Sequence, residues 1–187
     1  MKTQRIGSRI AITSFQGRWM ATVDGSIPDW QRQSLELWFG AWIALGCMLG
    51  YGALARPEGE QSFYAICLAF WTFFAVRAWR AVRWRRKGLE VIQLDGDRLI
   101  IRMNHGDRQG RPHTLSLSDL DRIEVVPPNP RSFLESIDQQ FWVIGGDRLI
   151  AHGGRRPLVF GKQLDASDAQ AFAKSLDKAI QAARKKG

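Results

Sequence analysis

The residues of this chain that could do catalytic or metal chemistry are few and dispersed. Its three histidines, at positions 105, 113 and 152, match no metal-binding spacing. The acids Asp95, Asp97, Asp107 and Asp147 lie beside glycines, where short carboxylate side chains commonly stabilise tight turns. Residues 106–110 lack the Gly-Lys-Ser/Thr ending of a phosphate loop, and no serine lies in a nucleophile elbow. The sequence therefore predicts a protein that is not an enzyme and that has no cofactor, metal or small-molecule substrate.

Cys47 and Cys67 are the only two thiols, and both lie in apolar segments. If each segment is helical, the cysteines are about 12 and 9 Å from the loop that joins the segments, so they could face each other. A disulfide, a metal site or a haem site are alternatives, but no CxxC motif or histidine stands near either cysteine. We therefore interpret both as small apolar packing residues.

The apolar segments predict a transmembrane hairpin over residues 35–80. Residues 37–55 form a run of nineteen without a charge, and residues 62–76 are apolar again. A bilayer core of about 30 Å needs roughly 20 helical residues, which places the spans at about 35–55 and 62–79. A buried hairpin of a soluble protein is the competing interpretation. It is disfavoured because a long uncharged run edged by tryptophans is unusual in so small a core.

Cations and tryptophans mark the ends of the predicted spans. We expect lipid headgroups to contact the basic residues that follow the second span, since long cationic side chains can reach phosphates from an apolar stem. These residues are Arg77, Arg80, Arg83, Arg85, Arg86 and Lys87. Tryptophan prefers the membrane interface, which predicts anchors at Trp30, Trp38, Trp79 and Trp84.

The distribution of lysine and arginine predicts that both termini are cytoplasmic. Five cations precede the first span, namely Lys2, Arg5, Arg9, Arg18 and Arg32, and six follow the second. The loop at residues 56–61 has one arginine and two glutamates, and positive residues are retained on the cytoplasmic side. No cleavable signal peptide is visible. The net charge of +9 is concentrated beside the spans, which favours anionic lipid rather than nucleic acid as the partner.

Small residues recur at helical spacing on both spans and predict close helix packing. They are Gly46, Gly50 and Ala53 on the first span, and Ala65 and Ala69 on the second. In lipid, helices associate through such positions because their backbones can approach closely. The two spans of the hairpin could use them to pack on each other, or a helix of another protein could occupy them.

Outside the hairpin, the sequence predicts an N-terminal arm at 1–34, a basic linker at 81–88 and a folded domain at 89–187. The arm has two strand-like runs within residues 9–23, which either join the sheet of the domain or lie against a partner. The domain has seven short strand-like runs separated by turn residues. They cover residues 90–94, 98–103, 113–117, 122–126, 141–144, 148–152 and 157–160. Asp95-Gly96 predicts a tight hairpin turn between the first two.

A final helix follows, with Asp165 as its cap and Phe172, Leu176, Ala179, Ile180 and Ala183 on one face. The runs LDGDRLIIR at 94–102 and LSLSDLDRIEV at 115–125, with this helix, resemble bacterial membrane proteins that have a pleckstrin-homology-like (PH-like) domain. The chain is also similar to two-span assembly factors of photosystem I and to a family of two-span bacterial proteins. The resemblance implies an α+β membrane protein whose cytoplasmic sheet forms a half-open barrel plugged by the last helix.

The sequence analysis leaves two functions open. The first is a scaffold, assembly factor or accessory subunit whose hairpin and domain bind a larger integral membrane complex, for example a respiratory or photosynthetic one. The second is an adaptor that the basic residues hold on anionic lipid. We favour the first, in the bacterial inner membrane, because anchoring already explains the lipid contacts and leaves the folded domain without a role.

Overall fold

The computed structural model describes residues 2–15, 18–127, 144, 146–154 and 156–185. These residues divide into two compact units, which we describe separately. One is a sheet unit formed by the described residues up to 26, by 87–127 and by those from 146 onward. The other is a helical unit that contains residues 27–86 and residue 144. The sheet unit thus takes its residues from both sides of the helical unit in the chain.

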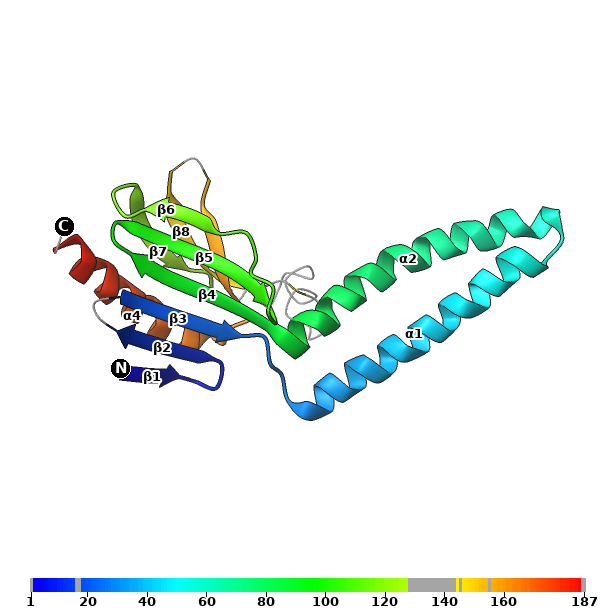
Figure 1. The fold of residues 1–187 in the computed structure, drawn as a ribbon, viewed down its shortest axis with the longest axis horizontal. Coiled ribbons are helices and arrows are strands. Elements are labelled where there is room, and N and C mark those ends of the chain that lie inside the picture. Colours follow the sequence, from blue (N-terminus) through cyan, green and yellow to red (C-terminus); the bar gives the residue numbers. More distant parts are fainter. Residues whose placement is uncertain (1, 16–17, 128–143, 145, 155, 186–187) are drawn as a thin grey trace. The chain divides into compact units, whose positions relative to one another are not determined.

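Six strands of the sheet unit form sheet A, in which each strand pairs antiparallel with the next (Figure 1). The strands are β1 (Lys2–Ile6), β2 (Ile10–Phe15), β3 (Arg18–Asp24), β4 (Gly88–Asp95), β5 (Arg98–His105) and β6 (His113–Ser116). The predicted tight turn between β4 and β5 is present, but its two turn residues are Gly96 and Asp97, since Asp95 still pairs with Arg98. Gly96 has a φ of +56°, a value that glycine adopts without strain.

Sheet B has three antiparallel strands, β7 (Leu120–Val125), β8 (Asp147–Gly153) and β9 (Leu158–Lys162). The two sheets do not close into a barrel. Of the strand predicted at 141–144, residues 141–143 lie outside the described residues, and Ile144 is in a bend. The other six strands predicted in this half of the chain are present, with ends that differ by at most two residues.

Helix α4 (Ala166–Arg184) supplies the core of the sheet unit, because it packs against β1 and β4 of sheet A and against β7 and β8 of sheet B. The predicted face is confirmed: Phe172, Leu176 and Ile180 are buried, and Ala179 and Ala183 are partly buried against the same cluster. Asp165 is the N-cap residue, but its side chain forms no capping hydrogen bond. Its backbone carbonyl accepts from the N–H of Ala169 instead.

The helical unit contains α1 (Asp29–Ala55) and α2 (Glu58–Lys87), an antiparallel pair joined by a short turn (Figure 1). Both helices are long and apolar enough to span a membrane. Helix α2 continues to Lys87, so the segment predicted as a linker at 81–88 is helical almost to its end. The cations of this segment therefore lie on one continuous helix with the apolar residues that precede them.

The N-terminal arm is part of sheet A. The hairpin predicted within residues 9–23 is β2 and β3, and β1 extends it. Strand β3 also pairs with β4 in an unbroken register from Trp19 opposite Leu94 to Asp24 opposite Leu89. The pairing continues with a hydrogen bond of 2.9 Å from the Gly25 N–H to the Gly88 carbonyl. The helical unit is therefore an insertion between two paired strands.

Candidate interaction surfaces

The interior of the hairpin is held by aromatic side chains that lie against glycines. Gly46 has no room for a side chain, because an added Cβ would be 2.1 Å from Cζ2 of Trp71. Gly52 faces Tyr64 in the same way, at 2.6 Å. The Trp71 indole N–H donates a hydrogen bond of 2.7 Å to the backbone carbonyl of Trp42, one helical turn before Gly46. A helical side chain covers the turn that precedes it, so the missing side chain at position 46 leaves this carbonyl accessible.

The predicted small-residue positions are therefore used unequally. Gly46 is in the hairpin interface, and Ala53 is half-buried. A Cβ on Gly50 would meet nothing within 4 Å, and Ala65 and Ala69 are exposed. Two contacts between the helices thus pair a glycine with an aromatic ring: Gly46 with Trp71, and Gly52 with Tyr64. Ala65 and Ala69 of α2 remain on the surface.

An ion pair joins the two helices near their open ends. Arg86 Nε donates to Glu36 Oε1 at 2.7 Å. Glu36 directly precedes the uncharged run of α1, and Arg86 is in the last turn of α2. Phe39 and Trp79 add a ring contact with centroids 5.9 Å apart. Arg86, predicted to bind a headgroup, thus also connects α1 to α2.

The predicted lipid-binding cations fall into two groups. Arg77, Arg80, Arg83 and Lys87 are exposed, and the Arg77 guanidinium lies 5.8 Å from the centroid of the Phe73 ring. Arg85 differs, because only 4% of it is exposed. A buried guanidinium is not available to a headgroup, so this role is left to the exposed cations.

The predicted interfacial tryptophans divide in the same way. Trp30, Trp38 and Trp79 are exposed by 64%, 48% and 52%, whereas Trp84 is exposed by 1%. Trp84 is therefore a packing residue in this structure. Trp38 stacks on Trp42 with centroids 5.4 Å apart.

The two cysteines of the helices do not form a disulfide with each other. Cys47 is exposed and Cys67 is half-buried, so only Cys67 fits the packing role that we predicted.

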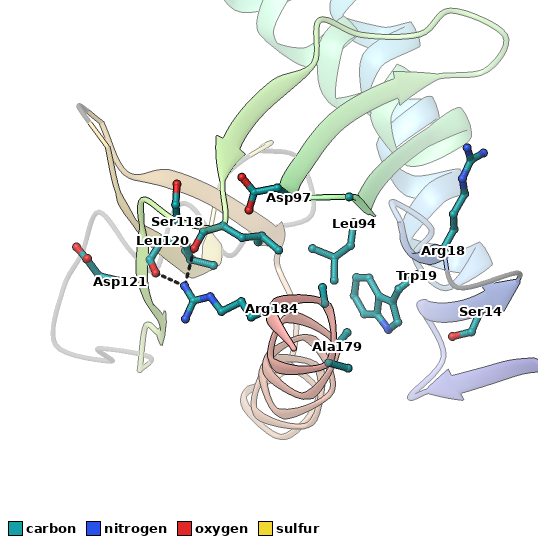
Figure 2. Close-up of a pocket in the computed structure, with 14 residues that line it drawn as sticks. Ser14, Arg18, Trp19, Leu94, Asp97, Ser118, Leu120, Asp121, Ala179 and Arg184 are labelled. Carbon is teal, nitrogen blue, oxygen red and sulfur yellow. Dashed lines mark hydrogen bonds between the residues drawn. The ribbon is translucent and has the colours of Figure 1, made fainter. Parts of the chain in front are cut away.

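The sheet unit has an open cleft of about 950 Å³ where β3 begins and β4 ends (Figure 2). Its apolar lining includes Trp19, Leu94 and Ala179, and its polar lining includes Arg18 and Asp121. The Trp19 ring stacks on buried Phe172 at 6.2 Å, which fixes one wall. The helical unit is inserted at the opposite ends of the same two strands. Within the sheet unit, the cleft is thus remote from the positions where the chain leaves for the helices.

Arg184 closes one side of this cleft. Its guanidinium donates to the carbonyls of Leu117 and Leu120, at 2.7 and 2.5 Å (Figure 2). These carbonyls lie in the turn that carries the chain from sheet A to sheet B. A cation at the end of a helix is also favoured by the helix dipole. The sequence indicated the dipole effect but not this contact, because Leu117 is 67 residues away.

A histidine, a glutamate and an arginine lie together on sheet B. His152 Nε2 lies 2.7 Å from Glu124 Oε2, and Arg122 lies 3.4 Å from the same oxygen, but all three are on one sheet and not in the cleft. Within the described part of the chain, no three histidine, cysteine or acidic side chains are placed to hold a metal ion.

Comparison of the chain with protein-family models, with curated proteins and with solved structures finds no match in any of the three. The PH-like resemblance remains a prediction from sequence patterns.

Proposed function

We propose that this chain is a non-enzymatic, membrane-anchored scaffold that acts as an assembly factor or accessory subunit of a larger integral membrane complex. In this proposal α1 and α2 cross the bacterial inner membrane, both termini are cytoplasmic, and the sheet unit binds the partner from that side. Exposed positions on the helices and the cleft of the sheet unit provide the contacts.

The observation that carries the proposal is the insertion of an apolar helical hairpin between two paired strands. Residues before α1 and residues after α2 form one sheet, with Asp24 opposite Leu89. Both must lie on the same side of any membrane that the hairpin crosses. This supports a topology with an even number of spans, and the lysine and arginine distribution predicts that the side is cytoplasmic.

The exposure of the helices supports a membrane rather than a soluble core. Within the 18-residue apolar stretch of each helix, only 11% is buried in α1 and 22% in α2. Leu37, Leu54 and Phe70 are exposed by 78%, 85% and 66%. Apolar patches of this extent need lipid or a protein partner around them.

Two surfaces could receive a protein partner. Ala65 and Ala69 lie on α2 outside the hairpin interface, and small residues allow another helix to approach closely in lipid. The cleft of the sheet unit offers apolar and polar groups remote from the helical insertion. We also propose a PH-like fold for the part of the sheet unit that follows the hairpin, supported by its described strands β4 to β9 followed by α4.

The scaffold proposal predicts that the chain migrates with a defined large complex in native electrophoresis of membranes solubilised in mild detergent. Replacing both Ala65 and Ala69 with isoleucine should shift most of the chain to a small species, because the added side chains block the approach of a partner helix. An antibody to a terminal tag measures the distribution between the two bands.

The matched control is Ala44→Ile, a single substitution of the same type at an exposed position of α1. It should leave the large band intact. Alkaline carbonate should fail to extract the chain from membranes. Recovery of the unmodified chain as a lone monomer would overturn the scaffold proposal, and carbonate extraction would overturn the membrane anchor.

The alternative, an anionic-lipid adaptor, is favoured by the exposed cations at the end of α2. Arg80, Arg83 and Lys87 have no ion pair to an acid within the described residues that would compete with phosphates. Since each cation near an anionic surface contributes about 1 kcal/mol, three together would contribute about 3 kcal/mol to the attraction.

This alternative predicts that Arg80→Gln, Arg83→Gln and Lys87→Gln together lower the anionic phospholipid that co-purifies with the full chain at least several-fold. The matched control changes Arg5, Arg98 and Arg111 to glutamine, since these are exposed cations of the sheet unit. Phosphorus assay and lipid mass spectrometry measure the ratio. Equal lipid retention in both triple variants would exclude the adaptor.

A further inference from the structure

A buried glutamate connects the two sheets of the sheet unit. Glu90 lies in β4 of sheet A and is exposed by only 3%. Its Oε2 accepts hydrogen bonds from two backbone N–H groups of β9 in sheet B: those of Gly161 at 2.8 Å and Lys162 at 3.3 Å. One carboxylate oxygen thus joins two strands that belong to different sheets.

The end of β9 needs these partners because its backbone leaves regular strand geometry. Gly161 has a φ of +74° and Gln163 a φ of +49°, both in the left-handed region. In this conformation the backbone N–H and carbonyl groups no longer point along the hydrogen-bond direction of a regular strand. Those that are buried need other hydrogen-bond partners. Gly161 also has little space for a side chain, since a Cβ would be 2.9 Å from Leu149 Cδ1.

Arg9 holds the carbonyl side of the same segment. Its guanidinium, in the turn between β1 and β2, donates to the carbonyls of Gln163 at 2.7 Å, Lys162 at 3.2 Å and Asp24 at 2.7 Å. The Glu90 side chain therefore accepts hydrogen bonds from the N–H groups of the β9 end, and the Arg9 guanidinium donates hydrogen bonds to its carbonyls. Both come from sheet A or its turns.

The charged groups around Glu90 have other hydrogen-bond partners. Lys162 Nζ, on β9, donates to Asp147 Oδ1 on β8 at 2.9 Å, and Arg9 binds carbonyls. Asp24, Asp165 and Asp168 lie around Arg9, from β3 and from the beginning of α4. Burial raises the pKa of Glu90 to about 7, while Lys162 and the two backbone N–H groups lower it less strongly and Asp147 raises it further.

We propose that Glu90 is a protonation-controlled clasp, which holds the end of β9 against sheet A when it is neutral and loosens when it is ionised. An ionised carboxylate gains from contact with water, and separation of the β9 end from sheet A provides that contact. We call the joined arrangement the closed state and the separated arrangement the open state. A neutral carboxyl group keeps an acceptor oxygen for the backbone N–H groups and has no such drive to open. Arg9 stays charged throughout and retains the carbonyls.

The sign of the pH dependence follows from proton binding. Between pH 4.5 and 7 the closed state binds more protons than the open state, because the pKa of Glu90 is higher when it is buried. The closed state is therefore favoured most below pH 4.5 and loses this advantage as the pH rises to about 7. Above pH 7, both states are ionised and the effect is constant.

Hydrogen exchange of the full chain in detergent tests the clasp. After correction for the intrinsic pH dependence of exchange, protection of the Gly161 and Lys162 amides should fall roughly a hundredfold between pH 4.5 and 7, then level off. The amide of Leu99, within sheet A, should show no such step. In Glu90→Gln, which keeps an acceptor oxygen without the titration, the step should disappear.

Glu124→Gln on β7 is the matched control, because the bond of 2.7 Å that this half-exposed carboxylate forms is to His152 of β8 and not to an amide of β9. It should keep the step. The same fall in Glu90→Gln, or a flat profile in the unmodified chain, would overturn the proposal. If Glu90→Gln fails to fold, the carboxyl ¹³C shift of Glu90 in the unmodified chain decides the question. A midpoint near 7 supports the clasp, and one near 4.5 overturns it.

Discussion

Phe172→Ala should lower the free energy of unfolding of the sheet unit by about 3–5 kcal/mol, the usual cost of removing a buried aromatic ring. Phe172 is fully buried at the centre of α4. Its ring stacks on Trp19 of sheet A at 6.2 Å and meets Phe160 of sheet B edge-on at 6.4 Å. Loss of the ring removes contacts to both sheets, so the cavity has little chance to close by a local shift.

Denaturant unfolding of the full chain in detergent, followed by near-ultraviolet circular dichroism, measures this effect. Val159→Ala on β9 is a suitable control, since that side chain is 52% exposed and its truncation should change stability by less than about 0.5 kcal/mol. A loss below 1 kcal/mol for Phe172→Ala would mean that α4 does not join the two sheets through this ring.

Gly46→Ala should weaken the helical hairpin by about 1–3 kcal/mol, although alanine is the better helix former. The new Cβ would lie 2.1 Å from the Trp71 ring, so the ring must move away from α1. That movement also breaks the bond from Trp71 Nε1 to the Trp42 carbonyl, which contributes about 1 kcal/mol. The change is small in volume but falls at the closest contact between the two helices.

Gly50→Ala, one turn further along the same helix, provides the control. A Cβ there meets nothing within 4 Å, so only the gain in helix propensity remains and the hairpin should be unchanged or slightly more stable. Unfolding by sodium dodecyl sulfate from mild detergent, with helicity and tryptophan fluorescence as signals, compares the two variants. Equal behaviour of both would contradict the Gly46–Trp71 contact.

The predicted use of small residues shows where sequence patterns reach their limit in this chain. The spacing of Gly46, Gly50, Ala65 and Ala69 predicts that backbones can approach, but it does not say which positions meet. In the structure Gly46 receives a tryptophan, whereas Ala65 and Ala69 remain exposed. The choice depends on how α2 is rotated about its axis, and that rotation is set by many contacts between helices.

The burial of Glu90 is a feature that the sequence analysis missed, although a local signal was present. It alternates with Ile92 and Leu94, and alternate residues of a strand share one face. A charged residue on the apolar face of a strand signals a buried carboxylate with a required partner. The partners themselves, Gly161 and Lys162, are 71 and 72 residues away and follow no local pattern.

By itself the sequence determined the helices α1, α2 and α4, six strands of the second half, and the tight turn at Gly96. These depend on apolar periodicity and turn residues, which act over a few neighbouring positions. Only the tertiary structure decided that the N-terminal arm joins sheet A beside β4, that Trp84 and Arg85 are buried, and that Arg9 and Glu90 hold β9. Such contacts join residues far apart in the chain, and their energies depend on the packing of the whole unit rather than on any local pattern.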